Sequence, residues 1–128
     1  MNIAITLPLD MCVELLEGRK CVEIRKNYPH NFNCLTDKVY VIMKGTHNVV
    51  CTFTVKDFTR YNNIYFVWNV FEKLIRVPWK WFYDYAKNAK CLYVWNISIV
   101  SPVEPSVDAE YLLGLTVNPQ SFVYVNPA

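Results

Sequence analysis

Glycine is scarce in this chain of 128 residues, and so is net charge of either sign. There are three glycines, and 13 Lys and Arg residues nearly balance 11 Asp and Glu residues, leaving a net charge of +2. This balance excludes a protein that coats a polyanion through its overall charge, but it permits a local basic patch. No GxGxxG, P-loop, HExxH or GxSxG pattern occurs. Nucleotide-fold oxidoreductases, P-loop NTPases and α/β-hydrolases are therefore poor candidates.

Long hydrophobic runs are also missing. None approaches the roughly 20 residues that a membrane-spanning helix needs, and the first residues lack the basic and apolar regions of a secretory signal. We therefore expect a cytoplasmic location and no membrane partner. Hydrophobic residues nevertheless make up 53% of the chain and aromatic residues 16%. This composition excludes disorder and predicts one domain, residues 1–128, with an aromatic-rich core.

The cysteines show no metal-binding or redox spacing. They are Cys12, Cys21, Cys34, Cys51 and Cys91. No pair has CxxC spacing, and neither His30 nor His47 lies near a Cys pair. A zinc site or a Cys–His hydrolase would be expected to show such patterns. We expect reduced thiols, no metal and no cofactor. Abundant Asn beside scarce Gly also suggests an AT-rich, viral coding genome.

Hydrophobic periodicity predicts the elements of the N-terminal half. Apolar residues at i, i+3, i+4 and i+7 indicate a helix over Pro8–Glu17, which Gly18 would end. A short strand follows at Cys21–Lys26. The period of two is cleanest in Val49–Asp57, which we expect to form a hairpin with Val39–Met43.

The C-terminal half mixes helices and strands. The residue types of Ile64–Ile75 favour a strand, but their spacing is helical and Asn62 and Asn63 are both plausible N-caps, so we predict a helix. The remaining expected elements are a helix from Pro78 to Lys87, a central strand Cys91–Ile99, a helical turn at Asp108–Leu113 and a short strand in the tail 118–125. Prolines are expected to separate the elements. This order predicts an α+β fold, a curved sheet or partly closed β-barrel with peripheral helices.

The most informative stretch holds four cations within eight residues: Arg19, Lys20, Arg25 and Lys26. Glu23 and Arg25 share one face of the predicted strand, with Lys20 at the corner beside them. Such an acid, amine and guanidinium could together grip a phosphate and a base edge. The alternative is an exposed strand face with a Glu–Arg pair that contributes little energy.

An aromatic run offers a second candidate surface. Trp81 and Tyr85 lie four residues apart, away from a stripe that includes Trp79, Phe82 and Tyr83. The stripe indicates a helix packed on the core, whereas the other two rings could stack on bases.

Three segments resemble the ASCH-domain family. LLEGRKCVEIRK (15–26) is similar to the family signature, a helix that ends at Gly and leads through Lys into a Glu-x-Arg strand. CLYVWNISIV (91–100) and NPQSFVYV (118–125) follow in the family's order. The resemblance implies a PUA-like β-barrel and binding of RNA or a modified nucleoside in a cleft. It further implies that Lys20, Glu23 and Arg25 line that cleft and that Gln120 and Ser121 border it.

Some ASCH relatives are small amidohydrolases that act on N4-acetylcytidine, which gives an alternative function. The resemblance would make Lys20 the base, and Glu72 is the one Glu near the position of the catalytic acid. Glu23 stands where those enzymes have Thr, and it would favour the charged amine over the neutral base. The first hypothesis is therefore a non-catalytic RNA- or nucleotide-binding domain and the second is an N4-acylcytidine-type amidohydrolase. A third is a viral protein that contacts the host and whose cleft is vestigial.

Overall fold

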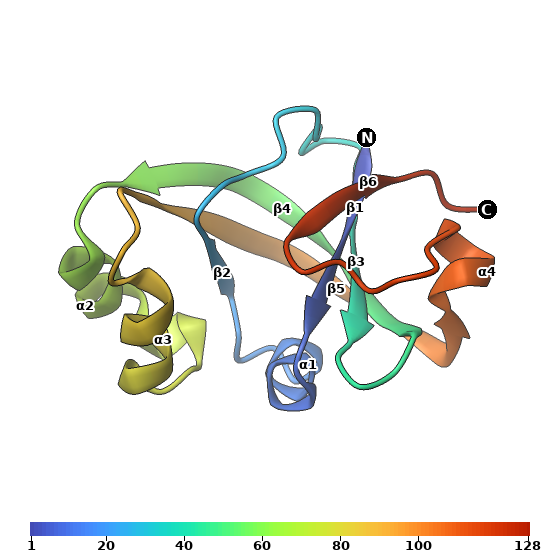
Figure 1. Cartoon of the computed structure of the whole chain (residues 1–128), viewed down its shortest axis with the longest axis horizontal. Helices are drawn as coiled ribbons and strands as arrows, with labels where there is room; N and C mark the ends of the chain where they lie inside the picture. The colour runs from blue at the N-terminus through green and yellow to red at the C-terminus, as the bar shows by residue number, and fades with distance from the viewer.

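The computed structural model describes residues 1–128 and contains six strands and four helices. The strands are β1 (Asn2–Leu7), β2 (Val22–Arg25), β3 (Val39–Met43), β4 (Asn48–Tyr61), β5 (Leu92–Asp108) and β6 (Phe122–Val125), and the helices are α1 (Leu9–Leu16), α2 (Ile64–Ile75), α3 (Trp79–Ala86) and α4 (Ala109–Leu113). Helices α2 and α3 lie at one end of the molecule and α4 at the other (Figure 1).

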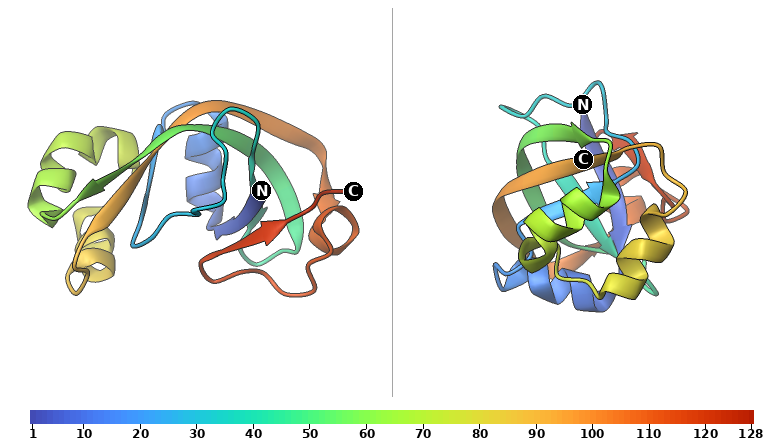
Figure 2. Two further views of the ribbon diagram at one scale, coloured as in Figure 1. Left: turned by 90° about the horizontal axis from the view of Figure 1, so that it is seen from above. Right: turned by 90° about the vertical axis from the view of Figure 1, so that its left-hand side faces the viewer.

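All six strands form one curved sheet in the order β2-β5-β4-β3-β1-β6. The β1–β3 pair is parallel and the other pairs are antiparallel. The long strands β4 and β5 arch across the molecule (Figure 2), and their pairing register shifts at three places along the ladder. Such irregularities bend strands and raise their twist. The predicted α+β fold with a curved sheet and peripheral helices is confirmed.

Both long strands extend beyond their expected ends. The sequence predicted Cys91–Ile99, but β5 continues to Asp108 and includes Pro102 and Pro105. The expectation that these prolines separate elements is wrong. Strand β2 covers only residues 93–96 of β5, so the rest of β5 is paired on one side alone. A free edge tolerates proline because no neighbouring strand needs its missing N–H.

Strand β1 is the one element that the sequence analysis missed. Its register pairs Ile3 with Val39 of β3 on one side and with Tyr124 of β6 on the other. Ile3, Ala4 and Ile5 are fully buried. Residues 2–7 do alternate, with Ile3, Ile5 and Leu7 on one face and Asn2, Ala4 and Thr6 on the other. The segment is only six residues long, and its pairing with β3 and β6 is what defines it as a strand.

The helix ends follow local sequence signals. Pro8 precedes the first turn of α1, and Gly18 takes a positive φ of 77° just after the helix, as a C-terminal glycine does. Helix α2 spans the predicted residues, and the Asn63 side chain accepts hydrogen bonds from the N–H groups of Tyr65 and Phe66. Both predictions, the α2 helix and its Asn63 cap, are confirmed.

Three buried clusters hold the helices to the sheet. The largest joins α1 to the concave face around Trp95, the second joins α2 and α3 to β2 and β5, and the third packs α4 against β1, β3, β4 and β6. Phe82 is buried as the helical stripe predicted, whereas Trp79 and Tyr83 are 40% and 36% exposed. Helix α3 covers one end of the sheet, so only a narrow face of it is buried.

The five cysteines are free thiols in different environments. Cys12 and Cys51 are buried, and the other three are partly exposed. Burial raises the pKa of Cys12 to about 11 and that of Cys51 to about 12. None of the four helices has the length and apolar character that crossing a membrane requires.

We predict two classes of thiol reactivity. In the denatured protein, without prior reduction, all five cysteines should react with an alkylating reagent. In the native protein at pH 7.5, Cys12 and Cys51 should stay unmodified while Cys21, Cys34 and Cys91 react, because thiolates are the reactive form and burial suppresses them. Peptide mass spectrometry after timed alkylation measures this order. Fewer than five reactive thiols in the denatured chain would contradict it.

Candidate functional site

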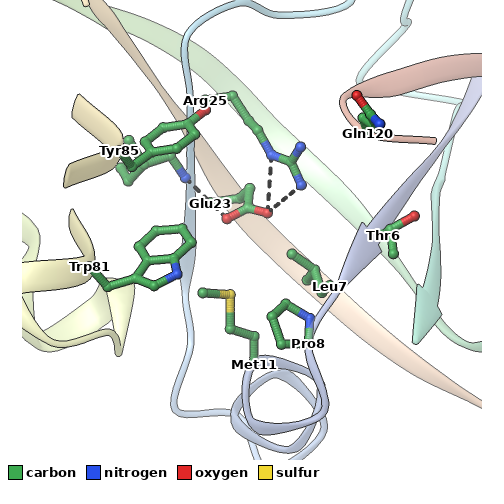
Figure 3. Close-up of a pocket in the computed structure, with 10 residues that line it drawn as sticks. Thr6, Leu7, Pro8, Met11, Glu23, Arg25, Trp81, Tyr85 and Gln120 are labelled. Atoms are coloured by element: carbon green, nitrogen blue, oxygen red, sulfur yellow. Dashed lines mark hydrogen bonds and ion pairs between the residues drawn. The ribbon is translucent and has the colours of Figure 1, made fainter. Parts of the chain in front are cut away.

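A cleft of about 150 Å³ opens where β1, α1, β2, α3 and the loop before β6 meet (Figure 3). Its lining residues are Thr6, Leu7, Pro8, Met11, Glu23, Ile24, Arg25, Trp81, Tyr85 and Gln120. They come from segments far apart in the chain, and only the folded sheet brings them together.

A buried charge cluster forms one wall of the cleft. The Glu23 side chain lies between two cations, with Oε1 3.4 Å from Lys20 Nζ and Oε2 3.1 Å from Arg25 Nη2. Arg25 Nε donates a second hydrogen bond to the same oxygen at 3.3 Å. The Ile24 N–H donates to Oε1 at 3.2 Å. The cluster carries one negative and two positive charges, so an excess positive charge remains at the cleft.

Lys20 lies behind this wall and not in the lining. The residue is 2% exposed, and its Nζ donates to the Ile75 carbonyl at the end of α2 at 3.0 Å. The Cys21 N–H donates to the neighbouring Leu74 carbonyl at 3.0 Å. These bonds satisfy carbonyl groups that a helix end leaves free, where a cation is favoured. The expectation that Lys20 lines the cleft is therefore corrected: it anchors α2 to the start of β2.

The two cations decide the charge of Glu23. Burial by itself would raise the pKa of this carboxyl group, but Lys20 and Arg25 outweigh burial and hold the pKa below its usual value. Glu23 is therefore a carboxylate at neutral pH. Its lone pairs are occupied by the protein, and the free Nη1 of Arg25 is the donor of this cluster that a ligand can use.

Aromatic rings form the opposite wall. Trp81 and Tyr85 of α3 stack with their centroids 5.5 Å apart and their planes 10° apart. The Lys26 ammonium lies 4.7 Å from the centroid of the Tyr85 ring, and the Lys26 N–H donates to the Tyr85 hydroxyl. Tyr85 is thus engaged by two neighbours, whereas Trp81 is 45% exposed. Trp81 is therefore the ring with free surface. The hypothesis that an aromatic ring of this helix stacks on a base requires such a surface.

Polar groups of β1 and the last loop face these walls (Figure 3). The Thr6 hydroxyl is buried and has no hydrogen-bond partner within the protein. Such an oxygen can both donate and accept a hydrogen bond, and leaving it unpaired is unfavourable. Gln120, which the ASCH resemblance placed at the cleft, lies beside it. Sequence reasoning missed Thr6 because it missed β1.

Four other predicted residues lie outside the cleft lining: Lys26, which contacts Tyr85, and Arg19, Glu72 and Ser121. Arg19 is on the surface, where it pairs with Glu14 and Glu17. Glu72 is exposed on α2 and lines a separate depression, and Ser121 is exposed next to Gln120. The structure therefore does not bring Glu72 together with Lys20. No group of three or more His, Cys, Asp or Glu side chains lies close enough to hold a metal ion.

The loop that carries Gln120 is tied to the β3–β4 turn through His47. The ring Nδ1 lies 2.6 Å from Asn118 Oδ1 and Nε2 lies 2.7 Å from the Leu115 carbonyl. Asn118 Nδ2 donates to the Thr46 carbonyl, which fixes the amide orientation. Both ring nitrogens therefore face acceptors, and both bonds form only when the imidazole is doubly protonated.

We predict that this His47 contact weakens as the pH rises. The Leu115 carbonyl, then Asn118, and then the charges of Asp108 and Glu110 raise the pKa of His47 above 6.5. Its stabilising contribution is complete below pH 6.5 and is lost as the pH rises through the higher folded-state value. His47→Ala should thus lower the urea midpoint more at pH 5.5 than at pH 8.5. Equal losses at the two pH values would contradict the prediction.

We also predict that Glu23→Gln is strongly destabilising at pH 7. The change leaves Lys20 and Arg25 without their shared counter-charge, at a cost of about 3–5 kcal/mol of unfolding free energy. Denaturant unfolding measures this loss, and Glu17→Gln, at an exposed ion pair, is the control with little effect. Because the pKa of Glu23 is lowered, its contribution is present above pH 4.5 and is lost as the pH falls through the folded-state value. The unfolding free energies of the wild type and Glu23→Gln should therefore converge in acid. A difference that stays constant with pH would overturn the prediction.

Comparison with solved structures identifies the fold. Three crystal structures, of the ASCH protein from Zymomonas mobilis and of two of its single-residue mutants, superimpose on this chain with a TM-score of 0.84. Each covers 98% of this chain at 12% sequence identity, and the match spans 87–90% of those proteins. No protein-family model and no curated protein matches the sequence.

The architecture is thus a curved sheet with peripheral helices, shared with those structures. More particularly, the chain has the ASCH-domain fold, as the three sequence segments implied. At 12% identity the likeness concerns the backbone arrangement, and the chemistry has to be argued from this chain's own side chains.

Proposed function

We propose that this protein binds RNA or a nucleotide by taking one base into the cleft. The observation that carries the proposal is the facing arrangement of a partly exposed Trp81 ring and the Arg25 guanidinium across the cleft. An aromatic ring stacks on the face of any base, and a guanidinium donates to base carbonyl or ring-nitrogen acceptors.

The remaining polar groups suit the edge of a base. The Gln120 amide can both donate and accept hydrogen bonds, as alternating groups on a base edge require. A cleft of about 150 Å³ is smaller than the roughly 300–1,000 Å³ of drug-sized ligand sites. It suits a single base from an unpaired strand, and a duplex keeps its bases inside the stack.

The contacts of Lys20 favour binding over hydrolysis. A lysine that acts as a base must reach the ligand without its proton. Lys20 instead points its amine at the Ile75 carbonyl and at the Glu23 carboxylate, 3.0 Å and 3.4 Å away, and is not among the residues that line the cleft. Glu72 lies in a separate depression. The amidohydrolase alternative therefore has neither its base nor its acid in the cleft.

Trp81→Ala tests the proposal without disturbing the core. Loss of one stacking platform should weaken binding by roughly 5- to 150-fold, the equivalent of about 1–3 kcal/mol. Trp79→Ala is the matched control, since Trp79 has similar exposure on the same helix but lines a different depression. Equilibrium dialysis against the four ribonucleosides, their monophosphates and a short single-stranded RNA gives the affinities. Equal affinities in the wild type and in Trp81→Ala would contradict base binding in this cleft.

Mass spectrometry of the same mixtures separates binding from catalysis. We expect every probe to be recovered unchanged, and N4-acetylcytidine to keep its acetyl group after long incubation. Release of acetate by the wild type, but not by Lys20→Arg, which keeps the charge of the cluster but cannot easily give up a proton, would establish the amidohydrolase instead.

A further inference from the structure

A second and larger pocket opens directly onto the cleft. It has a volume of about 470 Å³. Its lining residues are Thr6, Pro8, Lys44, Trp81, Asn118, Pro119 and Gln120. Thr6, Pro8, Trp81 and Gln120 line both spaces, so a ligand whose base lies in the cleft continues into this pocket without a break.

The chemistry of this pocket favours an anion. Lys44 is its only charged lining residue, and no carboxylate is among the other six. The Lys44 amine forms no ion pair within the protein, unlike Arg19, Lys20 and Arg25. Its backbone is nevertheless held, because the Lys44 N–H donates to the Leu7 carbonyl at 2.8 Å. The Lys44 ammonium group is therefore unpaired at the pocket, on a backbone that is held in place.

The far side of the pocket is also held in place. The Asn118 amide is fixed between the His47 ring and the Thr46 carbonyl, at 2.6 Å and 2.7 Å. Since both ring nitrogens of His47 face acceptors, the doubly protonated form places a second positive charge behind Asn118. Asp108 and Glu110 face His47 as well, but neither lines the pocket.

We infer that this pocket is a phosphate subsite next to the base cleft. The inference rests on the proposed base binding and names the ligand class: a nucleotide or an unpaired RNA strand, and not a free nucleoside. The Lys44 ammonium supplies a charge-assisted contact to a phosphate oxygen, and the ribose spans the shared residues. The sequence analysis placed the phosphate and base contacts at Lys20, Glu23 and Arg25, and Lys44 was not among its candidates.

The test compares each ribonucleoside with its 5′- and 3′-monophosphates. The wild type should bind at least one monophosphate more tightly than the parent nucleoside, and Lys44→Ala should lose about threefold to tenfold of that affinity. Nucleoside binding should stay unchanged. Lys56→Ala, an exposed lysine on β4 that lines neither space, is the matched control and should retain the wild-type preference.

A short single-stranded RNA distinguishes a strand from a mononucleotide. For the RNA, the slope of log affinity against log salt concentration is negative. It should become less steep by about 0.7 in Lys44→Ala, as expected for the loss of one phosphate contact. RNA that binds no more tightly than the best monophosphate identifies a mononucleotide as the ligand and leaves the subsite intact.

The failures of the two proposals are distinguishable. If nucleosides and monophosphates bind the wild type equally, or if Lys44→Ala and Lys56→Ala behave alike, the phosphate subsite is wrong while base binding stands. If Trp81→Ala leaves the affinity of every probe unchanged, base binding fails. Inorganic phosphate that binds the wild type as tightly as the monophosphates would likewise overturn the linked arrangement, since the base would then contribute nothing.

Discussion

A carboxylate shared by two cations organises this end of the protein. Glu23 is 5% exposed and lies between Lys20 and Arg25, and each partner connects it to a different part of the fold. Lys20 donates to the Ile75 carbonyl at the end of α2, and Arg25 lies with its guanidinium 5.8 Å from the Trp95 ring. Burying three charges is costly unless each is paired. The cluster therefore links the end of α2 to the start of β2 and leaves one guanidinium donor free in the cleft.

The residues of this cluster differ in which of their polar atoms remain available to a ligand. Glu23 uses its oxygens on Lys20, Arg25 and the Ile24 N–H, so it offers little to a ligand. Arg25 uses one edge of its guanidinium on Glu23 and keeps Nη1. A group held rigidly by a buried partner loses little entropy when it binds a ligand. The acid thus positions the guanidinium, which is the group that the proposed function assigns to hydrogen-bond acceptors on a base.

The cleft and the second pocket are positioned by different kinds of contact. Lys26 and Tyr85 support Trp81 on one wall, and the His47 contacts support Asn118 on the other. The Trp81 support consists of stacking and a cation over a ring and has no titrating acid at its centre. The Asn118 support depends on the imidazole proton. A change of pH near neutrality therefore acts on the proposed phosphate subsite before it acts on the proposed base cleft.

The sequence determined the local structure and the charge cluster. Helical spacing predicted α2 over Ile64–Ile75, Asn63 capped it, and alternation put Glu23 and Arg25 on one strand face, because these features depend on near neighbours in the chain. Tertiary structure decided the rest. β1 is a six-residue segment that its pairing with β3 and β6 defines as a strand, and the position of Thr6 in the cleft follows from that pairing. Lys20 moved behind the cleft because the end of α2, 55 residues away, provides its acceptor, and Lys44 joined Gln120 because β1, the β3–β4 turn and the last loop meet there.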